Sequence, residues 1–564
     1  MASTVLPFDI NAITPTNERW DEICSQMSPE FQQACAESHF LAEYVMRLPI
    51  EEIGVPDFYP KPSRSLGDLP VKNLIYPIEE GLFVHLYPDT IGARDHYIPI
   101  EPTVGVDFED LMPQIEERLV IYAEKIGQLD DIDEKRTLLL DLIDTICTTD
   151  KLVTINRRRP LIWVTPQQME AVRYRVLRDK VGLGVLQPLL LDPNIEDISC
   201  SGVGHIFIEH KIFKSVQSTI VFIDYDDVDD FAVWLGEWIK SPVTVRNPLV
   251  DAVLPDGSRI NIVYGREISK RGSNFTIRKF SGTPVSALEL VEFGSINYMM
   301  LAYLSLMLEA GMNVFVVGAT ASGKTTLLNA ITTFIQPDAK IVTIEDTPEV
   351  QVPHHNWVQE STRHGGGEKQ GSDVGMFDLL KAALRQRPDM IIVGEIRSME
   401  AVVAFQAMQT GHGVMSTFHA ASVEKLIQRL TGDPINIPKT YIDNLNLAVI
   451  QAAVRLADGR SARRVLSINE IIGYDPVSES FSFLEAFRWN PTNDTFEFPG
   501  YMNSFLLEQI IAIKRGIPPH RRKEVYDEVK RRAKILEKLH KEKGVSDFYE
   551  LFSVLSEARR QKLI

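Results

Sequence analysis

A glycine-rich turn that ends in a lysine and two threonines is the strongest chemical signal in the chain. The stretch GATASGKTT matches the pattern G-x-x-x-x-G-K-[ST], with an apolar strand before it and a helical segment after it. Glycines let backbone N–H groups close around phosphate oxygens, and the helix N-terminus adds a positive dipole end. We therefore predict a P-loop in which Lys324 reaches the β- and γ-phosphates and the Thr325 hydroxyl ligates Mg²⁺. The predicted nucleotide-binding residues here are Gly318, Ala319, Thr320, Ala321, Ser322, Gly323, Lys324, Thr325 and Thr326.

An apolar segment at 390–395, MIIVGE, ends in the acidic residue Glu395. A carboxylate at the exposed end of a strand can hold the water shell of Mg²⁺ or orient an attacking water. We interpret this segment as the strand beside the P-loop, with Gly394 leaving room for the phosphates. Asp389 precedes the apolar run, so we expect it in a turn at the opposite end of the strand.

A third acidic stretch, IVTIEDTPEV, places Glu345, Asp346 and Glu349 after another apolar segment. Hydrolysis needs a base that takes the proton of the attacking water, and by spacing alone any of these three carboxylates qualifies. His412 and His419 bracket a further short strand. Without a neighbouring cysteine or acid they form a weak metal pair, so each is either a buried structural residue or a group that senses the γ-phosphate.

Composition bounds the class of protein. A chain of 564 residues is too long for a single hydrophobic core, so its length predicts two to four domains. The formal net charge of −18 argues against bulk nucleic-acid binding. Four scattered cysteines without CxxC spacing suggest a reducing compartment, and the N-terminus lacks the pattern of a secretion signal. The apolar stretch at 298–321 has membrane-span length, but we interpret it as a helix that ends at Gly311 followed by a buried strand.

The alternation of elements divides the chain into five regions. Strand-like segments with proline-rich connections come first and are followed by acidic helices. Alternating strands with one helix at 227–240 come next, and then a rhythm of buried strands and helices that predicts a mainly parallel sheet. The last sixty residues read as helices in which basic residues outnumber acidic ones. The predicted regions are 1–110 (N-terminal domain), 111–187 (helical connection), 188–290 (small α/β domain), 297–500 (P-loop ATPase domain) and 501–564 (basic helical tail).

The P-loop, the acidic stretch after the next apolar segment, the strand that carries Glu395 and the histidine pair, in this order and spacing, resemble the motifs of the secretion-ATPase superfamily. This superfamily comprises the hexameric motors of type II secretion, type IV pili, conjugation and archaeal filaments. The family's P-loop corresponds to 318–325, its aspartate box to 341–349, its glutamate-ended Walker B strand to 390–397 and its histidine box to 412–419. The resemblance covers about 165–490 and includes LPDGSRIN and FTIRKF. It implies an α/β fold: a RecA-like P-loop domain with a mainly parallel sheet, preceded by a smaller PAS-like α/β domain and an N-terminal extension.

The resemblance also implies roles for individual residues. Glu349, the second glutamate of the aspartate box, is similar to the family's general base, and Glu395 to its Walker B acid, which joins Thr325 in holding Mg²⁺, partly through water. Arg259 and Arg278 match arginines that the preceding domain brings to the phosphates, sometimes across a subunit boundary. Arg246 is a weaker candidate of the same kind, and His419 is included among the nucleotide-binding residues.

Two departures from the bacterial pattern indicate the archaeal branch. The P-loop carries Ala321 where bacterial members mostly have glycine, and the aspartate box reads EDTPE. The chain most resembles the archaellum motor ATPase and the ATPases that assemble archaeal type IV pili. The implied cofactors are ATP and Mg²⁺. The implied partners are five further copies of the chain, a polytopic membrane platform protein and accessory cytoplasmic motor proteins at the inner face of the membrane; no nucleic acid is expected.

Several alternatives remain open in the sequence. The resemblance fits a type II/IV secretion or conjugation-type translocation ATPase as well, and a nucleotide-gated scaffold with little turnover shares the same motifs. The stretch 362–375 reads as a loop that lines either a ring or a subunit boundary, or has no task. The basic tail faces acidic partner loops, anionic lipid or only solvent. The filament driven, the direction of work, the ring symmetry and the contacts of residues 1–110 are not fixed by the sequence.

Overall fold

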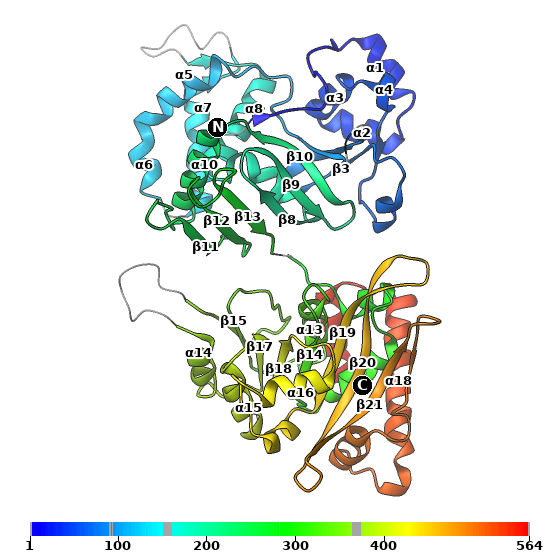
Figure 1. Ribbon diagram of the computed structural model, residues 1–564. Coiled ribbons are helices and arrows are strands. Elements are labelled where there is room, and N and C mark those ends of the chain that lie inside the picture. The colour runs from blue at the N-terminus through cyan, green and yellow to red at the C-terminus, as the bar shows by residue number, and fades with distance from the viewer. Residues whose placement is uncertain are drawn as a thin grey trace. The chain divides into compact units, whose positions relative to one another are not determined.

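The computed structural model divides the chain into two compact units, Met1–Ser281 and Gly282–Ile564. It describes residues 3–89, 92, 94–129, 131–150, 161–280, 282–363 and 374–561. Each unit has its own sheet and its own hydrophobic core (Figure 1).

Among the described residues of the first unit, eleven strands form one sheet in the order β11-β12-β13-β8-β9-β10-β5-β4-β3-β2, with β1 on β10. Strand residues alternate between the core and the other face; in β12, Ile260 and Ile262 are buried while Arg259 and Asn261 are exposed. The strands are β1 (Ser3–Thr4), β2 (Asp57–Phe58), β3 (Leu74–Pro77), β4 (Phe83–Tyr87), β5 (His96–Ile100), β8 (Ile195–Cys200), β9 (Gly204–His210), β10 (Lys214–Phe222), β11 (Leu249–Val253), β12 (Arg259–Val263) and β13 (Asn274–Arg278).

Helices cover this sheet in three groups. Phe31, Leu41 and Tyr44 of the first group pack on Ile75 and Ile98 of the sheet. The second group forms a separate core beside the short parallel pair β6 (Cys147–Thr148) and β7 (Ile162–Trp163), and the predicted helix α10 packs on the sheet itself. The helices are α1 (Asn17–Cys24), α2 (Pro29–Glu37), α3 (His39–Met46) and α4 (Ile50–Ile53); α5 (Leu111–Leu119), α6 (Ala123–Gly127), α7 (Ile132–Ile146) and α8 (Pro166–Lys180); and α9 (Gln187–Leu191) and α10 (Tyr225–Trp238).

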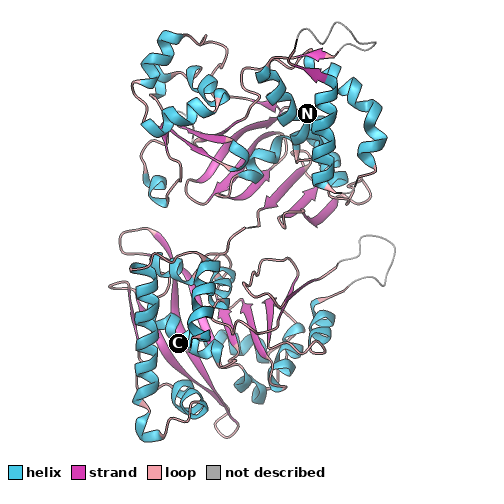
Figure 2. Ribbon diagram, turned by 180° about the vertical axis from the view of Figure 1, so that it is seen from behind, coloured by secondary structure: helices cyan, strands magenta, loops and turns pink. Residues whose placement is uncertain are grey.

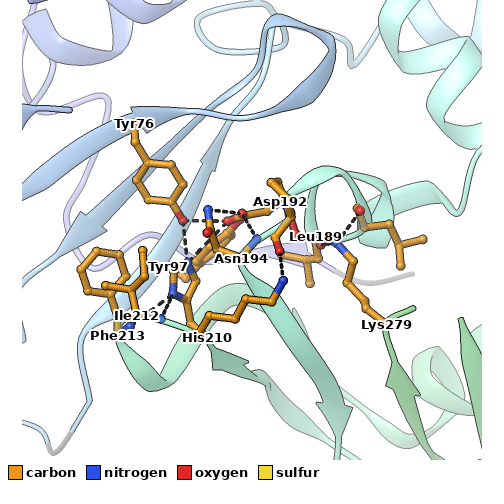
Figure 3. A network of polar contacts seen from close by, with 12 residues as sticks. Tyr76, Tyr97, Leu189, Asp192, Asn194, His210, Ile212, Phe213 and Lys279 are labelled. Atoms are coloured by element: carbon orange, nitrogen blue, oxygen red, sulfur yellow. Dashed lines mark hydrogen bonds and ion pairs between the residues drawn. The ribbon is translucent and has the colours of Figure 1, made fainter. Parts of the chain in front are cut away.

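The N-terminal segment shares its sheet with the segment that precedes the P-loop domain. Strand β5 pairs in parallel with β10, so strands from 1–110 and from 188–290 belong to one hydrogen-bonded layer. A buried polar network reinforces the junction (Figure 3). Oδ2 of Asp192 accepts hydrogen bonds from the hydroxyls of Tyr76 (2.7 Å) and Tyr97 (2.9 Å), which lie on β3 and β5. The proposed domain boundaries and the PAS-like fold remain predictions.

Among the described residues of the second unit, nine strands form a sheet in the order β16-β15-β17-β18-β14-β19-β20-β21-β22. The first six strands in this order, β16 through β19, pair in parallel. Strands β20, β21 and β22 add antiparallel pairs. Strand β20 lies within the region 297–500, where the sequence predicts a mainly parallel sheet, and it belongs to the antiparallel part. The strands are β14 (Val314–Val317), β15 (Ile341–Glu345), β16 (Trp357–Ser361), β17 (Met390–Ile396), β18 (Gly413–Phe418), β19 (Leu447–Arg455), β20 (Ser461–Asp475), β21 (Ser480–Asn490) and β22 (Thr495–Glu497).

Helices cover both faces of this second sheet (Figure 2), as parallel sheets require. Val314 and Val316 of β14 belong to the core under α12, α13 and α18, and Phe315 and Val317 to the core under α14, α15 and α16. The mixed α/β fold predicted from the sequence is thus confirmed. The helices are α11 (Ala287–Glu292), α12 (Tyr298–Glu309), α13 (Lys324–Thr332), α14 (Met376–Ala383), α15 (Glu400–Gln409), α16 (Val423–Thr431), α17 (Ala512–Lys514), α18 (Lys523–Lys541) and α19 (Phe548–Arg560).

Two further expectations concern the ends of this unit. The apolar stretch forms α12 followed by β14, as predicted, and none of the described helices is both long and apolar enough to cross a membrane. The prediction that the last sixty residues form helices is also confirmed, but the alternative in which these helices face only solvent is wrong. Tyr526 and Val529 of α18 are buried in the core under α12, and Arg559 of α19 donates to the backbone oxygens of Phe334 and Ile335, just after α13.

Candidate active site

The glycine-rich turn links β14 to α13, the arrangement that the sequence predicts for a P-loop. A Cβ atom at Gly318 would lie 2.2 Å from the backbone oxygen of Gln451 on β19, so only glycine fits there. Gly323 has φ of +90° and is the N-cap of α13, a left-handed conformation that glycine adopts without steric cost. The two glycines therefore shape the turn for separate reasons, close packing and backbone conformation.

Ala321, at the apex of the turn, also has a positive φ of +59°. A non-glycine residue in this region carries a steric cost of about 1–2 kcal/mol. The guanidinium of Arg463, on β20, donates from Nε to the backbone oxygen of Ala321 at 3.3 Å. Sequence reasoning missed Arg463, because it lies 142 residues away in the chain and no spacing connects it to the P-loop.

Lys324 is 8% exposed, and its ammonium group donates to the backbone oxygen of Ala319 at 2.8 Å. Burial lowers the pKa of Lys324, while the negative charges of Glu395 and Glu349 oppose that shift. Both predicted catalytic carboxylates are thus close enough to this lysine to act on its charge. The arrangement brings together the three side chains to which the sequence assigned phosphate binding, water activation and magnesium handling.

Strand β17, which carries Glu395 one residue before its end, is not the neighbour of the P-loop strand, and this part of the prediction is wrong. Strand β18 lies between them, paired with β14 on one side and β17 on the other. The register of β17 on β18 shifts between Val393 and Glu395, so Gly394 forms a bulge at the end of the strand. The hydroxyl of Thr417 donates to the backbone oxygen of Gly394 at 2.7 Å. A bulge redirects the side chain that follows it, here Glu395.

Glu395 is held by two basic groups. Nε of Arg397 donates to Glu395 Oε2 at 2.8 Å, and Nε2 of His419 lies 2.5 Å from Oε1. Burial lowers the pKa of His419, as does Lys324, whereas Glu395 opposes the shift. His412 is at the other end of β18, where its Nδ1 lies 3.0 Å from the Thr410 hydroxyl. The structure therefore joins only one of the two bracketing histidines to the site.

The three acids of the aspartate box have different environments. Glu345 is 3% exposed and its Oε1 accepts the backbone N–H groups of Glu349 and Val350, both at 2.9 Å. Burial raises the pKa of Glu345 to about 8. Asp346 is exposed and accepts a hydrogen bond from the Thr362 hydroxyl at 3.1 Å. Glu349 is half-buried, and its carboxylate is the one of the three that acts on Lys324. The three acids thus differ in burial and in partners, and the assignment of the base among them stays a prediction.

Gly394 makes room for a protein side chain. A Cβ atom there would lie 2.9 Å from Cγ and 3.0 Å from Oε1 of Glu345. The sequence interpretation, in which this glycine leaves space for the phosphates, is corrected accordingly. Asp389 lies where the sequence predicts, before β17, and its Oδ2 accepts the backbone N–H of Lys340 at 2.8 Å.

The magnesium prediction can be tested against the donor set. Among the described residues, no cluster of three or more His, Cys, Asp or Glu side chains has the geometry to hold a metal ion. Mg²⁺ at a nucleotide site takes only one or two protein carboxylates and completes its shell with phosphates and water. Glu395 Oε1 is buried, lies 2.5 Å from Nε2 of His419 and accepts no hydrogen bond of normal geometry from the described residues. Thr325, at the start of α13, and Glu395 fit such a sparse shell.

The predicted arginines belong to the first unit. Arg259 on β12 and Arg278 on β13 are direct cross-strand partners, and both side chains are exposed. Arg259 donates from Nε to Asp251 Oδ1 at 2.9 Å. Arg246 is exposed in the segment that precedes β11. The loop predicted at 362–375 lies outside the described residues from 364 to 373.

Comparison with known proteins defines the class. Residues 180–479 match the family described as Type II/IV secretion system protein. A Methanocaldococcus jannaschii protein is 41% identical over 93% of this chain and 96% of its own length, and a second one is 48% identical over 45% and 92%. The protein VirB11 of Agrobacterium fabrum is 30% identical over 42% of this chain and 76% of its own length.

Solved structures resemble parts of the chain more distantly. The VirB11 ATPase of Brucella suis is 24% identical, with a TM-score of 0.26 over 52% of this chain and 93% of that protein. The pilus retraction motor PilT with bound ADP is 20% identical, with a TM-score of 0.37 over 50% and 80%. Because both TM-scores are below 0.4, the family assignment depends on the sequence matches.

The parallel sheet and its P-loop thus define a P-loop nucleotide-binding protein. The chain belongs to the Type II/IV secretion system protein family, the secretion-ATPase superfamily that the motifs resemble. The archaeal relatives, matched over nearly their whole length, fit the archaeal branch that Ala321 and the EDTPE box indicated. The family implies nucleotide use and ATP hydrolysis, and the residue roles are taken up as proposals.

Proposed function

We propose that this chain hydrolyses ATP at the P-loop of its second unit and uses the energy to drive an archaeal filament. The observation that carries the proposal is the place of Glu395 near the end of β17 and of Glu349 just after β15, two parallel neighbours in the sheet whose strand β14 leads into the P-loop and Lys324. Both carboxylates oppose the lowering of the pKa of Lys324 by burial. Phosphoryl transfer depends mainly on positioning and on the stabilisation of developing charge. A site that combines a buried lysine with two differently held carboxylates suits that task.

Each residue has a separate role in this mechanism. The P-loop amides and Lys324 bind the β- and γ-phosphates, and Thr325 and Glu395 hold Mg²⁺, partly through water. When bound, Mg²⁺ neutralises phosphate charge. Glu349 takes the proton from the attacking water, because its carboxylate is neither buried like Glu345 nor turned to solvent like Asp346. His419 contacts Glu395 and reports the loss of the γ-phosphate through that contact.

Arg259 and Arg278 complete the proposal from the first unit. Their guanidinium groups stabilise the charge that develops on the phosphates, in the same subunit or in a neighbouring one. The support is their match to the family's arginines and their place as exposed cross-strand partners on β12 and β13. Once the γ-phosphate is lost they lose their strongest partner, which allows their domain to shift.

The work done by this cycle is proposed from the resemblance and the archaeal relatives. A homohexamer at the cytoplasmic face of the membrane would act on a polytopic platform protein, with accessory motor proteins, to assemble or rotate an archaellum or a type IV pilus. The ATPase domain is RecA-like and the domain before it PAS-like. The second candidate is a type II/IV translocation ATPase, which the similarity to VirB11, named in one relative as a type IV secretion system protein, favours.

A phosphate-release assay on the purified full-length chain tests the hydrolysis. We expect turnover that depends on ATP and Mg²⁺, and its loss in Lys324→Ala and in Glu349→Gln. Glu349→Gln should still bind a fluorescent ATP analogue, because the phosphate-binding residues are unchanged. Asp346→Asn serves as the matched control at an exposed acid of the same box and should retain turnover. Normal rates in either of the first two variants would refute the assigned role.

Deletion of the gene separates the two candidate functions. Cells that stop swimming indicate an archaellum, and cells that swim but lose adhesion fibres indicate a pilus. Cells that keep both but fail to export a protein substrate support the translocation ATPase.

A further inference from the structure

Glu345 is a buried acid to which the proposed mechanism gives no task. It ends β15, the strand between β16 and β17, with 3% of its side chain exposed. Its Oε1 accepts the backbone N–H groups of Glu349 and Val350, so it closes the turn that carries the proposed base. Its Oε2 is buried and accepts no hydrogen bond from any described residue. A buried acid costs free energy, which makes its retention worth explaining.

The other side of Glu345 faces the strand that carries the second catalytic carboxylate. Its Cγ and Oε1 occupy the space in front of Gly394, where a Cβ atom would lie 2.9 and 3.0 Å from them. Gly394 is the bulge residue that redirects Glu395, and its backbone oxygen is fixed by the Thr417 hydroxyl. One side chain therefore touches both the turn before Glu349 and the bulge before Glu395.

We propose that Glu345 is a positioning residue that sets the base Glu349 and the magnesium-handling Glu395 relative to each other. The inference rests on the proposed function of that site. Each catalytic carboxylate is on a short irregular segment, and Glu345 is the buried side chain that both segments contact. Misplacement of a reacting group by about 1 Å can cost about 10²-fold in rate. Loss of the contacts of Glu345 would therefore affect turnover more than nucleotide binding.

Two substitutions at Glu345 separate positioning from stability. Glu345→Ala removes the acceptor, and we expect kcat to fall about 10²-fold while affinity for a fluorescent ATP analogue changes less than about 3-fold. Glu345→Gln keeps an oxygen that accepts the same two N–H groups, and we expect kcat within about 3-fold of the unchanged chain. Full turnover in Glu345→Ala would overturn the proposal. Equal loss in both variants would also overturn it, because the carboxylate itself would then be required.

A substitution at Gly394 tests the contact between Gly394 and Glu345 if Glu345→Ala fails to fold. Gly394→Ala places a methyl group against Glu345, and we expect kcat to fall about 10-fold with nucleotide affinity retained. In the Glu345→Ala background, the same change should cost less than about 2-fold, because contacting residues are not additive. Gly127→Ala, at a glycine with nothing within 4 Å, is the matched control and should leave kcat unchanged. Unchanged turnover in Gly394→Ala, or full additivity with Glu345→Ala, would contradict the proposal.

Hydrolysis at the P-loop and the positioning role of Glu345 can be tested apart. Absence of ATP hydrolysis by the unchanged chain would remove the proposed function and the positioning role with it. Hydrolysis that Glu349→Gln abolishes but Glu345→Ala leaves intact would remove only the positioning role.

Discussion

The buried network of the first unit and the acidic site of the second contain similar side chains. They differ in the hydrogen bonds that their carboxylate oxygens accept. Around Asp192, two tyrosine hydroxyls and Asn194 donate to the carboxylate, and Nδ1 of His210 accepts two backbone N–H groups (Figure 3). Around Glu395, in contrast, one carboxylate oxygen is buried 2.5 Å from Nε2 of His419 without a hydrogen bond of normal geometry from the described residues. Glu345 also has a buried oxygen that accepts no hydrogen bond from the described residues.

This contrast distinguishes polar groups that stabilise the fold from polar groups that serve a ligand. A buried network with every partner present fixes the backbone, as Lys279 does when it donates to the backbone oxygens of Leu190 and Asp192, both at 2.5 Å. A cluster of carboxylates whose buried oxygens lack hydrogen bonds of normal geometry is costly for the chain alone. Such a cluster is expected where a ligand supplies the missing partners.

The largest expected effect is on turnover at the acidic site. Glu395→Gln should lower kcat about 10³-fold, equivalent to about 4 kcal/mol in the activation barrier, because the charge near the phosphates is lost. Binding of the fluorescent ATP analogue should persist. The free energy of unfolding should change by less than about 1 kcal/mol, because exposed ion pairs such as that with Arg397 contribute little. Full activity would remove Glu395 from the site.

Removing the buried carboxylate of the first unit should have the opposite profile. Asp192→Ala leaves the hydroxyls of Tyr76 and Tyr97 without their acceptor, and we expect the free energy of unfolding to fall by about 3 kcal/mol. Urea denaturation followed by circular dichroism measures the loss. A stability equal to that of the unchanged chain would mean that the network is not what holds β3 and β5 to the segment at Asp192.

Acid should weaken the first unit through the same residue. Burial alone would raise the pKa of Asp192, but the contact with His210 and the hydrogen bond from Tyr76 lower it to about 2. A lowered folded-state pKa gives stability that is present above the ordinary value and lost as pH falls through the folded one, here between about pH 4 and pH 2. The loss should be about 2 kcal/mol in urea titrations, and Asp192→Asn should remove that component. An identical acid response in both proteins would contradict the account.

The smallest expected effect is at the apex of the P-loop. Ala321→Gly should raise the free energy of unfolding by about 0.5–1 kcal/mol, because glycine adopts a positive φ without steric cost and this gain exceeds its greater entropy loss on folding. Ala319→Gly is the matched control, since Ala319 has no positive φ, and it should not stabilise the chain. Thermal unfolding measures both. Equal shifts in the two variants would show that strain at Ala321 is not the cause.

Local pattern predicted the parts of the site that lie on single strands and turns. The P-loop, β17 and β18 could be found because the sequence signal and the structure involve the same few residues. Strand order could not, since the insertion of β18 between β14 and β17 is a pairing of distant segments. For the same reason the contact of Gly394 with Glu345 and that of Arg463 with Ala321 had no signal in the sequence.

The sheet of the first unit shows the same limit. Each strand could be recognised by its alternation, but the parallel pairing of β5 with β10 joins segments about 120 residues apart. Sequence analysis therefore treated 1–110 and 188–290 as separate regions, although they share one layer.

The most direct test is a single-turnover measurement on the purified full-length chain, with the unchanged sequence and Glu349→Gln compared side by side. The account predicts that both bind ATP with similar affinity and that only the unchanged chain releases phosphate. Equal phosphate release from the two, or tight binding without release by either, would contradict it.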